Sequence, residues 1–353
     1  MKTKESGERI RSTRKAAERS TTIRDVARLA AVSVGTVSRS LNLPATVRPA
    51  TLAKVQAAIA ALNFRPDSRA QNMRRRNTMT VGFVVDDITN PLHAETFKAA
   101  DAQMRLHGYS LYLVNTRGRA EDESVAIDML QHGRADGVIM TINSEADERT
   151  RKLMGQLRIP SVLLDRDIPL EIDAVLTDHA AGMMQAANYL IGMGHRRIAL
   201  LSASTEIRPG RERLRGFVEA FHRNGLPVPE DLIRARNLSV EFGLHEANLL
   251  LGSAAPPTAM IAAGNRILVG VLKAVQQRGL RIPQDLSLIS CDKTDLSLLY
   301  PGSITLIDRD IHEIGSTAAQ FLLERLKHAG GPARRMVVPT RLILGGSCAP
   351  IVG

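Results

Sequence analysis

Two short amphipathic segments lie within residues 22–42, which read TIRDVARLAAVSVGTVSRSLN. Their apolar residues recur every three or four positions, at Ile23, Val26, Ala27 and Ala30 and then at Val37 and Leu41. This spacing puts apolar side chains on one face of a helix, so it predicts two helices. Thr22 and Ser33 precede them as capping residues, and Ala31 and Val32 form the turn. Because the second helix has a polar outer face, the segment is predicted to be a helix-turn-helix; a helical hairpin inside a larger core is the alternative.

A third helix is predicted for residues 50–62, where Leu52, Val55, Ile59 and Leu62 share one face and close a small core. Residues 67–76, DSRAQNMRRR, are strongly basic, and as an isolated helix they are too short to be stable in water. We expect them to be disordered in the free protein and helical only on DNA. Residues 1–20 are expected to form a flexible basic tail.

From residue 80 the pattern changes to short apolar runs that alternate with amphipathic stretches of helical length. The predicted strands are residues 80–85, 110–114, 137–140, 161–164, 174–176, 197–202, 258–263 and 286–290. The predicted helices include residues 92–107, 180–193, 210–224, 267–278 and 311–327. Such alternation is typical of parallel sheets covered by helices on both faces. Because the stretch is longer than one sheet requires, we expect two lobes whose strand ends face one shared cleft.

The charge of the chain is concentrated near its N-terminus. Of the net charge of +11 over 353 residues, residues 1–76 supply 17 Lys and Arg against 5 Asp and Glu, and the remainder is nearly neutral. A basic module on a neutral body is typical of a nucleic-acid-binding domain joined to a sensing domain. A membrane-surface helix is disfavoured because the tail lacks bulky apolar residues.

The number of cysteines and the hydropathy of the chain bear on its cellular compartment. Cys291 and Cys348 are the only cysteines and lack a metal-binding spacing, so we expect reduced thiols in a cytoplasmic protein. The sequence has no apolar segment of a signal peptide and no run near the roughly 20 apolar residues of a membrane span. No motif calls for a cofactor or metal, and none is expected. The histidines near expected helix ends, His107, His132, His195 and His328, are expected to be solvated or capping.

The chain resembles the lac repressor (LacI) family of transcription regulators over residues 22–345. The resemblance rests on residues 22–42, on KVQAAIAALNFRPDSRAQNMRRR, on VGFVVDDITNP at the start of the body, and on VLLDR, GHRRIALLS, RERLRGF and SLISCDKTDL. It implies an all-α helix-turn-helix head (residues 21–65), a hinge helix (66–77) and an α/β two-lobed body like periplasmic sugar-binding proteins (78–353). We expect residues 78–176 and 306–335 in one lobe, and residues 177–305 and 336–353 in the other.

The resemblance also implies a function. A homodimer would bind a pseudo-palindromic operator, most simply as a repressor, under the control of a small effector. Because the sequence ends without a leucine heptad, we expect no dimer of dimers. Met73 stands where the family usually has a Leu that enters the minor groove, and Gly35 offers no side chain to read a base. The expected DNA-binding residues are Thr22, Ser33, Val34, Gly35, Thr36, Ser38, Arg39, Asn42, Arg48, Ser68, Ala70, Gln71, Met73 and Arg74.

The effector is expected at the carboxyl ends of the body's strands, where open α/β sheets bind ligands. The expected binding residues are Asp86, Asn90, Asp165, Arg166, Arg213, Asn265, Asp292 and Arg309. The resemblance implies ligand-binding roles for Arg213 and Asp292 in particular, although Gly264 and Lys293 depart from the family pattern. The number of arginines in this set leaves a sugar, a sugar acid and a sugar phosphate all open as effectors. For any single residue, a helix cap or a surface ion pair is the alternative.

An enzyme is the main rival class of protein. The sequence has no GxSxG or Walker A motif and no histidine cluster with metal-binding spacing, and Gly345-Gly346 is too short for a phosphate loop. We therefore expect no catalytic activity. A DNA-binding scaffold with a non-functional cleft remains the other alternative, ahead of a sugar-processing enzyme.

Overall fold

The computed structural model describes residues 21–64, 77–328 and 330–351 and divides the chain into two units between Arg76 and Asn77. In the first unit, α1 (Ile23–Leu29), α2 (Val34–Asn42), the 3₁₀ turn η1 (Pro44–Thr46) and α3 (Pro49–Ala61) enclose a small core around Val26, Val37 and Val55. The expected basic tail and nearly all of the expected hinge helix lie outside the described residues.

The turn between α1 and α2 uses the predicted residues. Ala31 has a φ of 53°, and the N–H of Val32 donates to the carbonyl of Ala27 at 3.0 Å. The predicted N-cap of α2 is confirmed, because Ser33 Oγ accepts a hydrogen bond from the N–H of Thr36 at 3.1 Å. The N–H and hydroxyl of Thr22 donate to the Asp25 carboxylate at 3.0 and 2.6 Å. Local bonds on either side of one short turn thereby fix the two helices.

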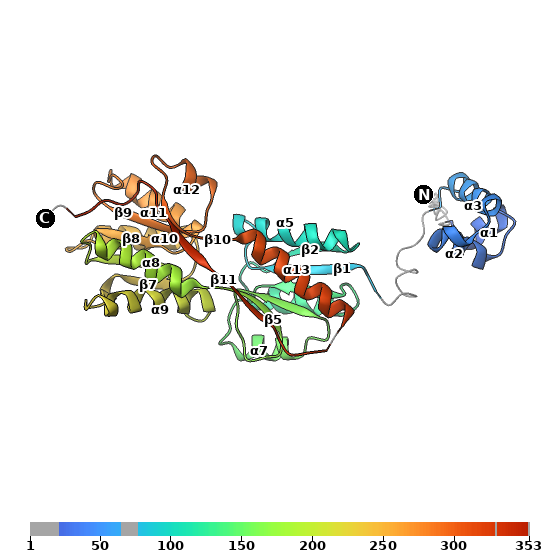
Figure 1. The fold of residues 1–353 in the computed structure, drawn as a ribbon, viewed down its shortest axis with the longest axis horizontal. Coiled ribbons are helices and arrows are strands. Elements are labelled where there is room, and N and C mark those ends of the chain that lie inside the picture. Colours follow the sequence, from blue (N-terminus) through green and yellow to red (C-terminus); the bar gives the residue numbers. More distant parts are fainter. Residues whose placement is uncertain (1–20, 65–76, 329, 352–353) are drawn as a thin grey trace, which may run out of the picture. The chain divides into compact units, whose positions relative to one another are not determined.

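Two six-stranded sheets form the body, one in each lobe (Figure 1). The first lobe has the order β11-β5-β4-β3-β1-β2, with all neighbouring strands parallel. Its strands are β1 (Thr80–Val85), β2 (Ser110–Asn115), β3 (Gly137–Met140), β4 (Ser161–Leu164), β5 (Asp173–Thr177) and β11 (Arg335–Val338). The second lobe has the order β12-β10-β9-β8-β6-β7, and its edge strand β12 is antiparallel to β10. Its strands are β6 (Ile198–Ala203), β7 (Ile233–Arg236), β8 (Ala259–Ala262), β9 (Ser287–Cys291), β10 (Thr305–Arg309) and β12 (Thr340–Ile343).

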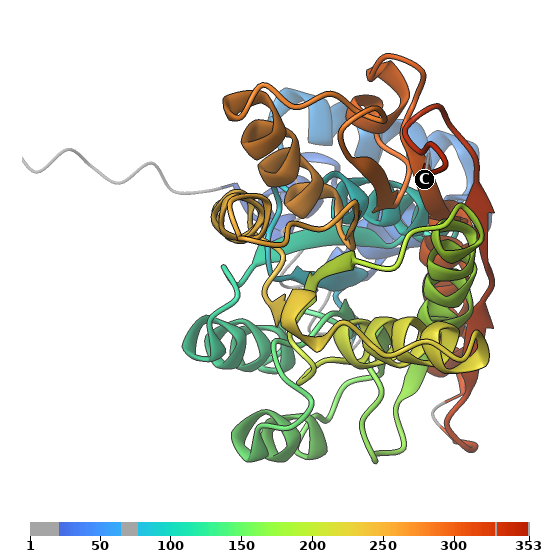
Figure 2. The same cartoon turned by 90° about the vertical axis from the view of Figure 1, so that its left-hand side faces the viewer.

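Helices cover both faces of each sheet, as the predicted fold class requires. In the first lobe α5 (Pro91–Leu106) and α13 (Ile311–Lys327) pack on one face, and α6 (Ala120–Gln131) and α7 (Glu148–Gly155) on the other. In the second lobe, which faces the viewer in Figure 2, α8 (His179–Gly192) and α9 (Arg208–Arg223) oppose α10 (Val240–Leu251) and α11 (Asn265–Gln277). The short elements η2 (Glu230–Leu232) and α12 (Asp295–Leu299) complete the second lobe. None of the described helices is long and apolar enough to span a membrane.

The chain passes between the lobes at Asp178, Asp310 and Pro339, and the expected lobe boundaries need correction. Residues 306–309 were assigned to the first lobe, but β10 pairs with β9 in the second sheet. Residues 336–338 were assigned to the second lobe, but β11 pairs with β5 in the first. The reason is physical: each of these strands is a continuous ladder, so the change of lobe falls at the residue after its last paired position.

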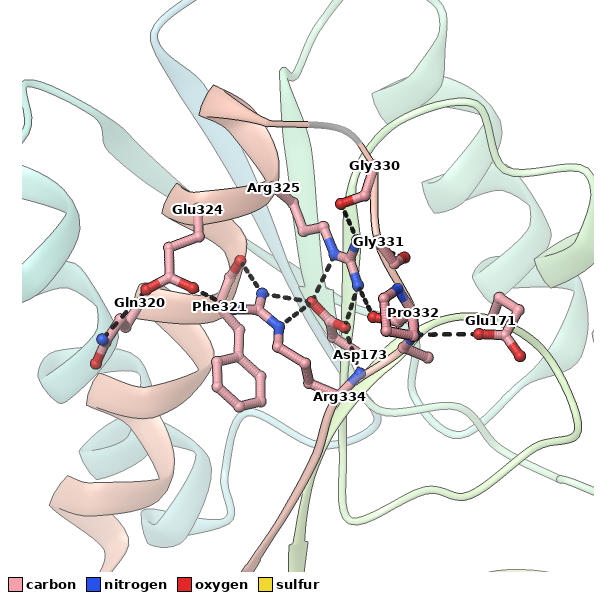
Figure 3. Close-up of polar contacts among 11 residues, drawn as sticks. Glu171, Asp173, Gln320, Phe321, Glu324, Arg325, Gly330, Gly331, Pro332 and Arg334 are labelled. Carbon is pink, nitrogen blue, oxygen red and sulfur yellow. Dashed lines mark hydrogen bonds and ion pairs between the residues drawn. The ribbon is translucent and has the colours of Figure 1, made fainter.

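Asp173 binds the C-terminal part of the chain to the first lobe through hydrogen-bonded ion pairs (Figure 3). Its carboxylate is buried and accepts hydrogen bonds from Arg325 at 2.8 and 2.9 Å and from Arg334 at 2.7 Å. The Arg334 guanidinium also stacks on the Phe321 ring, 4.2 Å from its centre. Burial favours the neutral acid, but these bonds outweigh it and lower the pKa of Asp173 to about 2.

His195 was expected to be solvated or to cap a helix. This expectation is wrong, because only 3% of the residue is exposed. Its ring nitrogens bond to the hydroxyls of Thr258 and Ser287 at 2.9 and 3.0 Å and to the carbonyl of Ala349 at 3.1 Å. Burial lowers the pKa of His195. The residue follows α8 directly, where a surface position is usual, but the C-terminal segment returns over it and excludes water.

Candidate functional site

A cavity of about 90 Å³ lies between the two lobes. Residues at the carboxyl ends of β1, β3 and β4 line it from the first lobe, and residues after β8, β9 and β10 line it from the second. All eight residues expected to bind an effector line this one cavity: Asp86, Asn90, Asp165, Arg166, Arg213, Asn265, Asp292 and Arg309. The topology brings them together because parallel strands end at the same edge of a sheet and the two edges face each other.

Arg309 joins the two lobes across the cavity. Its Nε donates to Asp292 at 2.8 Å, and its Nη1 donates to Asp165 and, at 2.8 Å, to the hydroxyl of Thr177. Asp165 is in the first lobe, whereas Arg309 and Asp292 are in the second. Burial favours the neutral acid of Asp165, but the charge of Arg309 holds its pKa well below the usual value. The three side chains therefore form one buried ionic cluster.

His179 lies against this cluster, with its Nε2 3.4 Å from Asp165 Oδ1. Burial, together with the charges of Arg213 and Arg309, lowers the pKa of His179 to about 4, against the opposing effect of Asp165. The ring is therefore neutral near neutral pH.

A second pair of contacts crosses the cavity at the N-terminus of α5. Asn90 caps this helix by accepting from the N–H of Leu92 at 3.1 Å, and the same oxygen accepts from Asn265 Nδ2 of the second lobe at 2.9 Å. Asp86 bonds to His93 at 2.8 Å. Burial opposes ionisation of Asp86, but the hydrogen bond and charge of His93 outweigh it and lower the pKa of the carboxyl.

Arg166 and Arg213 line the cavity from opposite lobes and are only 6% and 4% exposed. Arg166 donates to the carbonyls of Ile142 at 2.6 Å and of Asp165 at 3.1 Å. Arg213 donates to the carbonyl of Ala263 at 2.9 Å, and its Nε is buried with no hydrogen-bond partner. Both guanidiniums are thus held by backbone oxygens and retain donors that no carboxylate occupies among the described residues.

Ion pairs at the rim of the cavity also connect the lobes. Arg266 of α11 donates to Thr89 Oγ1 at 2.7 Å and lies 3.3 Å from Asp87. Elsewhere on the rim, the buried Glu145 accepts from the N–H of Arg208 at 2.8 Å and pairs with Arg211, both near the start of α9. The structure therefore shows the two lobes closed on each other.

A wider groove of about 870 Å³ adjoins the cavity and shares Leu92, Asn265, Arg309 and Ile311 with it. Its charged lining residues are Lys98, Arg266, Lys293 and Arg341 together with Glu95, Asp295, Asp308 and Asp310. Because these charges are of both signs, the groove does not favour one class of charged ligand.

In the N-terminal unit, α2 carries six of the fourteen expected DNA-binding residues, and all six are exposed or partly exposed. Val34 is 39% exposed, Gly35 and Arg39 are exposed, and Arg48 is exposed at the start of α3. A side chain at Gly35 would meet only Ser33 Oγ, at 3.7 Å. The polar atoms of Ser33 and Asn42 already bond within α2, to Thr36 and Ser38. Five expected residues lie outside the described ones: Ser68, Ala70, Gln71, Met73 and Arg74.

Sequence reasoning missed several residues of the cavity. His93 was not considered, although it lies three positions after the Asn90 cap and so on the same face of the first turn of α5. Thr141 follows β3 just as Asp165 follows β4, and the strand-end rule could have found it. The rim residues Glu145 and Arg266 gave no such signal, because their partners are in the other lobe.

Comparison with known proteins supports both parts of the chain. Residues 22–67 match the model of bacterial regulatory proteins of the lacI family, and residues 187–348 match the periplasmic binding protein-like domain. The chain is 32% identical over 307 residues to the HTH-type transcriptional repressor PurR of Vibrio vulnificus (strain CMCP6), covering 87% of this chain and 92% of that protein. It is 30% identical over 328 residues to the ribose operon repressor of Escherichia coli (strain K12), covering 92% and 99%. The solved lac repressor dimer bound to operator and the anti-inducer ONPF shares the fold with a TM-score of 0.82, at 25% identity over 93% of this chain and 99% of that one.

Proposed function

The chain belongs to the lacI family of bacterial regulatory proteins, which are not enzymes, and we propose that it represses transcription under the control of an effector bound in the interlobe cavity. One observation carries the proposal: eight residues spread from Asp86 to Arg309 line one cavity, and their bonds cross between the lobes. An occupant of that cavity would change the bonds that hold the lobes together. It could thereby shift the equilibrium between two states of the body.

The N-terminal unit supplies the DNA-binding surface in this proposal. Arg39 and Arg48 are exposed and form no ion pair within the described ranges, so they are free to meet phosphates. Two copies of the chain would place two α2 helices on the half-sites of a pseudo-palindromic operator. The related lac repressor is a dimer bound to operator, and a homodimer acting on DNA in the cytoplasm fits this arrangement.

The effector we propose is a sugar or sugar derivative. One relative is a ribose operon repressor, and carboxylates, amides and guanidiniums are the groups that bind polyols in closed cavities. The roles of the eight lining residues as effector ligands are part of the proposal.

The test compares operator affinity with and without effector in the full chain, after an operator is selected from random DNA and an effector from a metabolite screen. Arg213→Ala and Asp292→Ala should lose the response to effector and keep operator binding in its absence. Arg215→Ala, on the same helix but exposed and paired with Glu212, should respond like the wild type. If both cavity variants respond with wild-type effector affinity, the cavity is not the effector site. Chemical turnover of a screened compound would instead support the alternative that the protein is an enzyme.

A further inference from the structure

Three arginines line the interlobe cavity, and only one of them has a carboxylate partner. Arg309 pairs with Asp165 and Asp292, whereas the ion pairs of the described residues include none for Arg166 or Arg213. Both unpaired guanidiniums are more than nine-tenths buried. A buried charge is stable only when it is paired or fully hydrogen-bonded. The Nε of Arg213 is buried and has no hydrogen-bond partner among the described residues, so it can still donate to an acceptor.

Each of the three carboxylates of the cavity already has a partner, although Asp165 Oδ1 is buried without a hydrogen bond among the described residues. Asp165 and Asp292 share Arg309, and Asp86 bonds to His93 at 2.8 Å. These are the acceptors that a neutral sugar would need for its hydroxyl groups. Among the described residues of the cavity, the charged groups without an ion-pair partner are therefore positive, Arg166 in the first lobe and Arg213 in the second.

The backbone adds to this positive character. The helices α5, α9, α11 and α13 all begin at the cavity, since Leu92, Pro209, Asn265 and Ile311 of their first turns line it. The N-terminus of a helix carries a partial positive charge and favours anions. Four such termini surround the two unpaired guanidiniums.

We propose that the effector carries an anionic oxygen group, a carboxylate or a phosphate, which Arg166 of the first lobe and Arg213 of the second bind together. The inference rests on the proposed function and names the class of effector for the same cavity. Charge-assisted hydrogen bonds to both lobes would tie the anion directly to lobe closure. The rest of the effector is the sugar of the proposed function, so sugar acids and sugar phosphates are the probes.

The experiment is isothermal titration calorimetry of the full chain with matched probes. Each neutral aldopentose or aldohexose is compared with its own aldonic acid, uronic acid and terminal phosphate ester. At least one acid or ester should bind at least tenfold more tightly than its neutral parent. The carboxylate and phosphate arms show which anion the site prefers. If the neutral parents bind as tightly as their acids, or if no acid binds, the inference is overturned.

Variants locate the anion. Arg166→Gln and Arg213→Gln should each weaken binding of the anionic ligand by about tenfold to a hundredfold. This is the usual range for the loss of a hydrogen bond to a charged group. Arg166→Lys and Arg213→Lys keep the charge and should retain part of the preference for the acid. Arg215→Gln should bind like the wild type, because Arg215 is exposed on the outer side of α9. Operator binding without ligand and the melting temperature confirm that each variant is folded. Equal acid binding by the wild type and both Gln variants would overturn the assignment.

The two proposals fail in different ways. If an acid binds as described but leaves operator affinity unchanged, the anion site stands and the regulatory function fails. If a neutral sugar binds in the cavity and changes operator affinity, the regulatory function stands and the anion site fails.

Discussion

Asp165 and Asp292 occupy equivalent places in the two lobes and share one partner, the guanidinium of Arg309. Asp165 follows β4 and Asp292 follows β9, strands that hold the same position in the order of their sheets. Both residues have a positive φ, 50° and 69°, which non-glycine residues adopt at a cost in free energy. Two strained aspartates held by one arginine indicate that the cluster is maintained for its role between the lobes.

Arg309→Gln should destabilise the body by about 3 kcal/mol, because it leaves two buried carboxylates without their cation. Urea unfolding near neutral pH measures the loss. The pKa of Asp165 is well below 3.8 in the folded wild type, so its stabilising contribution is present above that value and is lost as the pH falls below it. The difference in the free energy of unfolding between wild type and variant should therefore become smaller as the pH falls. Arg341→Gln, whose side chain is 78% exposed, should cost less than about 1 kcal/mol. Equal effects of the two changes would contradict this account.

Asp173→Asn tests the cluster in Figure 3. The change keeps the shape of the side chain but removes the carboxylate partner of Arg325 and leaves Arg334 paired with Glu324 alone, so a loss of about 3 kcal/mol is expected. The pKa of Asp173 falls from 3.8 to about 2 on folding, so its contribution is complete above the first value and disappears as the pH drops towards the second. Asp167→Asn removes an exposed pair with Arg335 and serves as the control. Acid unfolding curves that coincide for wild type and Asp173→Asn would refute the prediction.

Arg39→Ala should weaken operator binding and flatten its dependence on salt. Each phosphate contact removed lowers the slope of log affinity against log salt by about 0.9, and a dimer would lose two contacts. Arg28→Ala should leave the slope unchanged, because Arg28 lies on α1 and pairs with Asp25. Filter binding or fluorescence anisotropy across a salt series provides the slopes. A footprint that protects a single unrepeated half-site would argue against two α2 helices on one operator.

Gly35→Gln should change which operators the protein prefers. The position is exposed at the start of α2, and an added Cβ would meet only Ser33 Oγ at 3.7 Å, so the head should still fold. A glutamine there could form two hydrogen bonds to an adenine in the major groove. Selection from random DNA followed by sequencing compares the preferred sites. Unchanged preference would mean that this position does not read bases and that glycine serves only the close approach of the backbone.

The eight strands could be predicted from the sequence because each contains an uninterrupted apolar run, which is buried in all of them except the edge strand β2. All eight predicted strands are present with ends within one residue, from β1 (Thr80–Val85) to β9 (Ser287–Cys291). The strands β7, β11 and β12 were missed because they are short edge strands with partly exposed residues. The missed strand β10 was read as part of the following segment, which misplaced the lobe boundary.

The residues of the candidate site also divide into those that the sequence could predict and those that it could not. Residues at strand ends, such as Asp86 and Asp165, could be predicted because the topology alone brings strand ends together. The pairing of Asp165 with Arg309, 144 positions apart, could not, since it depends on how the lobes close. The same holds for the rim: nothing in the sequence around Glu145 points to Arg211.

Glu145→Gln tests whether the rim holds the lobes closed. Glu145 is 7% exposed in the first lobe, yet its carboxylate bonds to the N–H of Arg208 and the guanidinium of Arg211 in the second. Its own N–H also donates to the carbonyl of Glu206 at 3.1 Å. Removing the charge should weaken these bonds and lower the fraction of closed protein before ligand binds.

Effector affinity reports that fraction, because the apparent dissociation constant rises as the binding-competent fraction falls. For Glu145→Gln we expect an effector Kd about tenfold higher, since a lost charge-assisted bond costs about 1.5 kcal/mol or more. Hydrogen exchange should become faster in residues 141–147 and 204–211 and remain unchanged in β8. Glu148→Gln, three residues away and exposed in the first turn of α7, should behave like the wild type in both measurements. If Glu145→Gln keeps both the wild-type Kd and the wild-type exchange rates, closure depends on the Asp165–Arg309–Asp292 cluster and not on the rim.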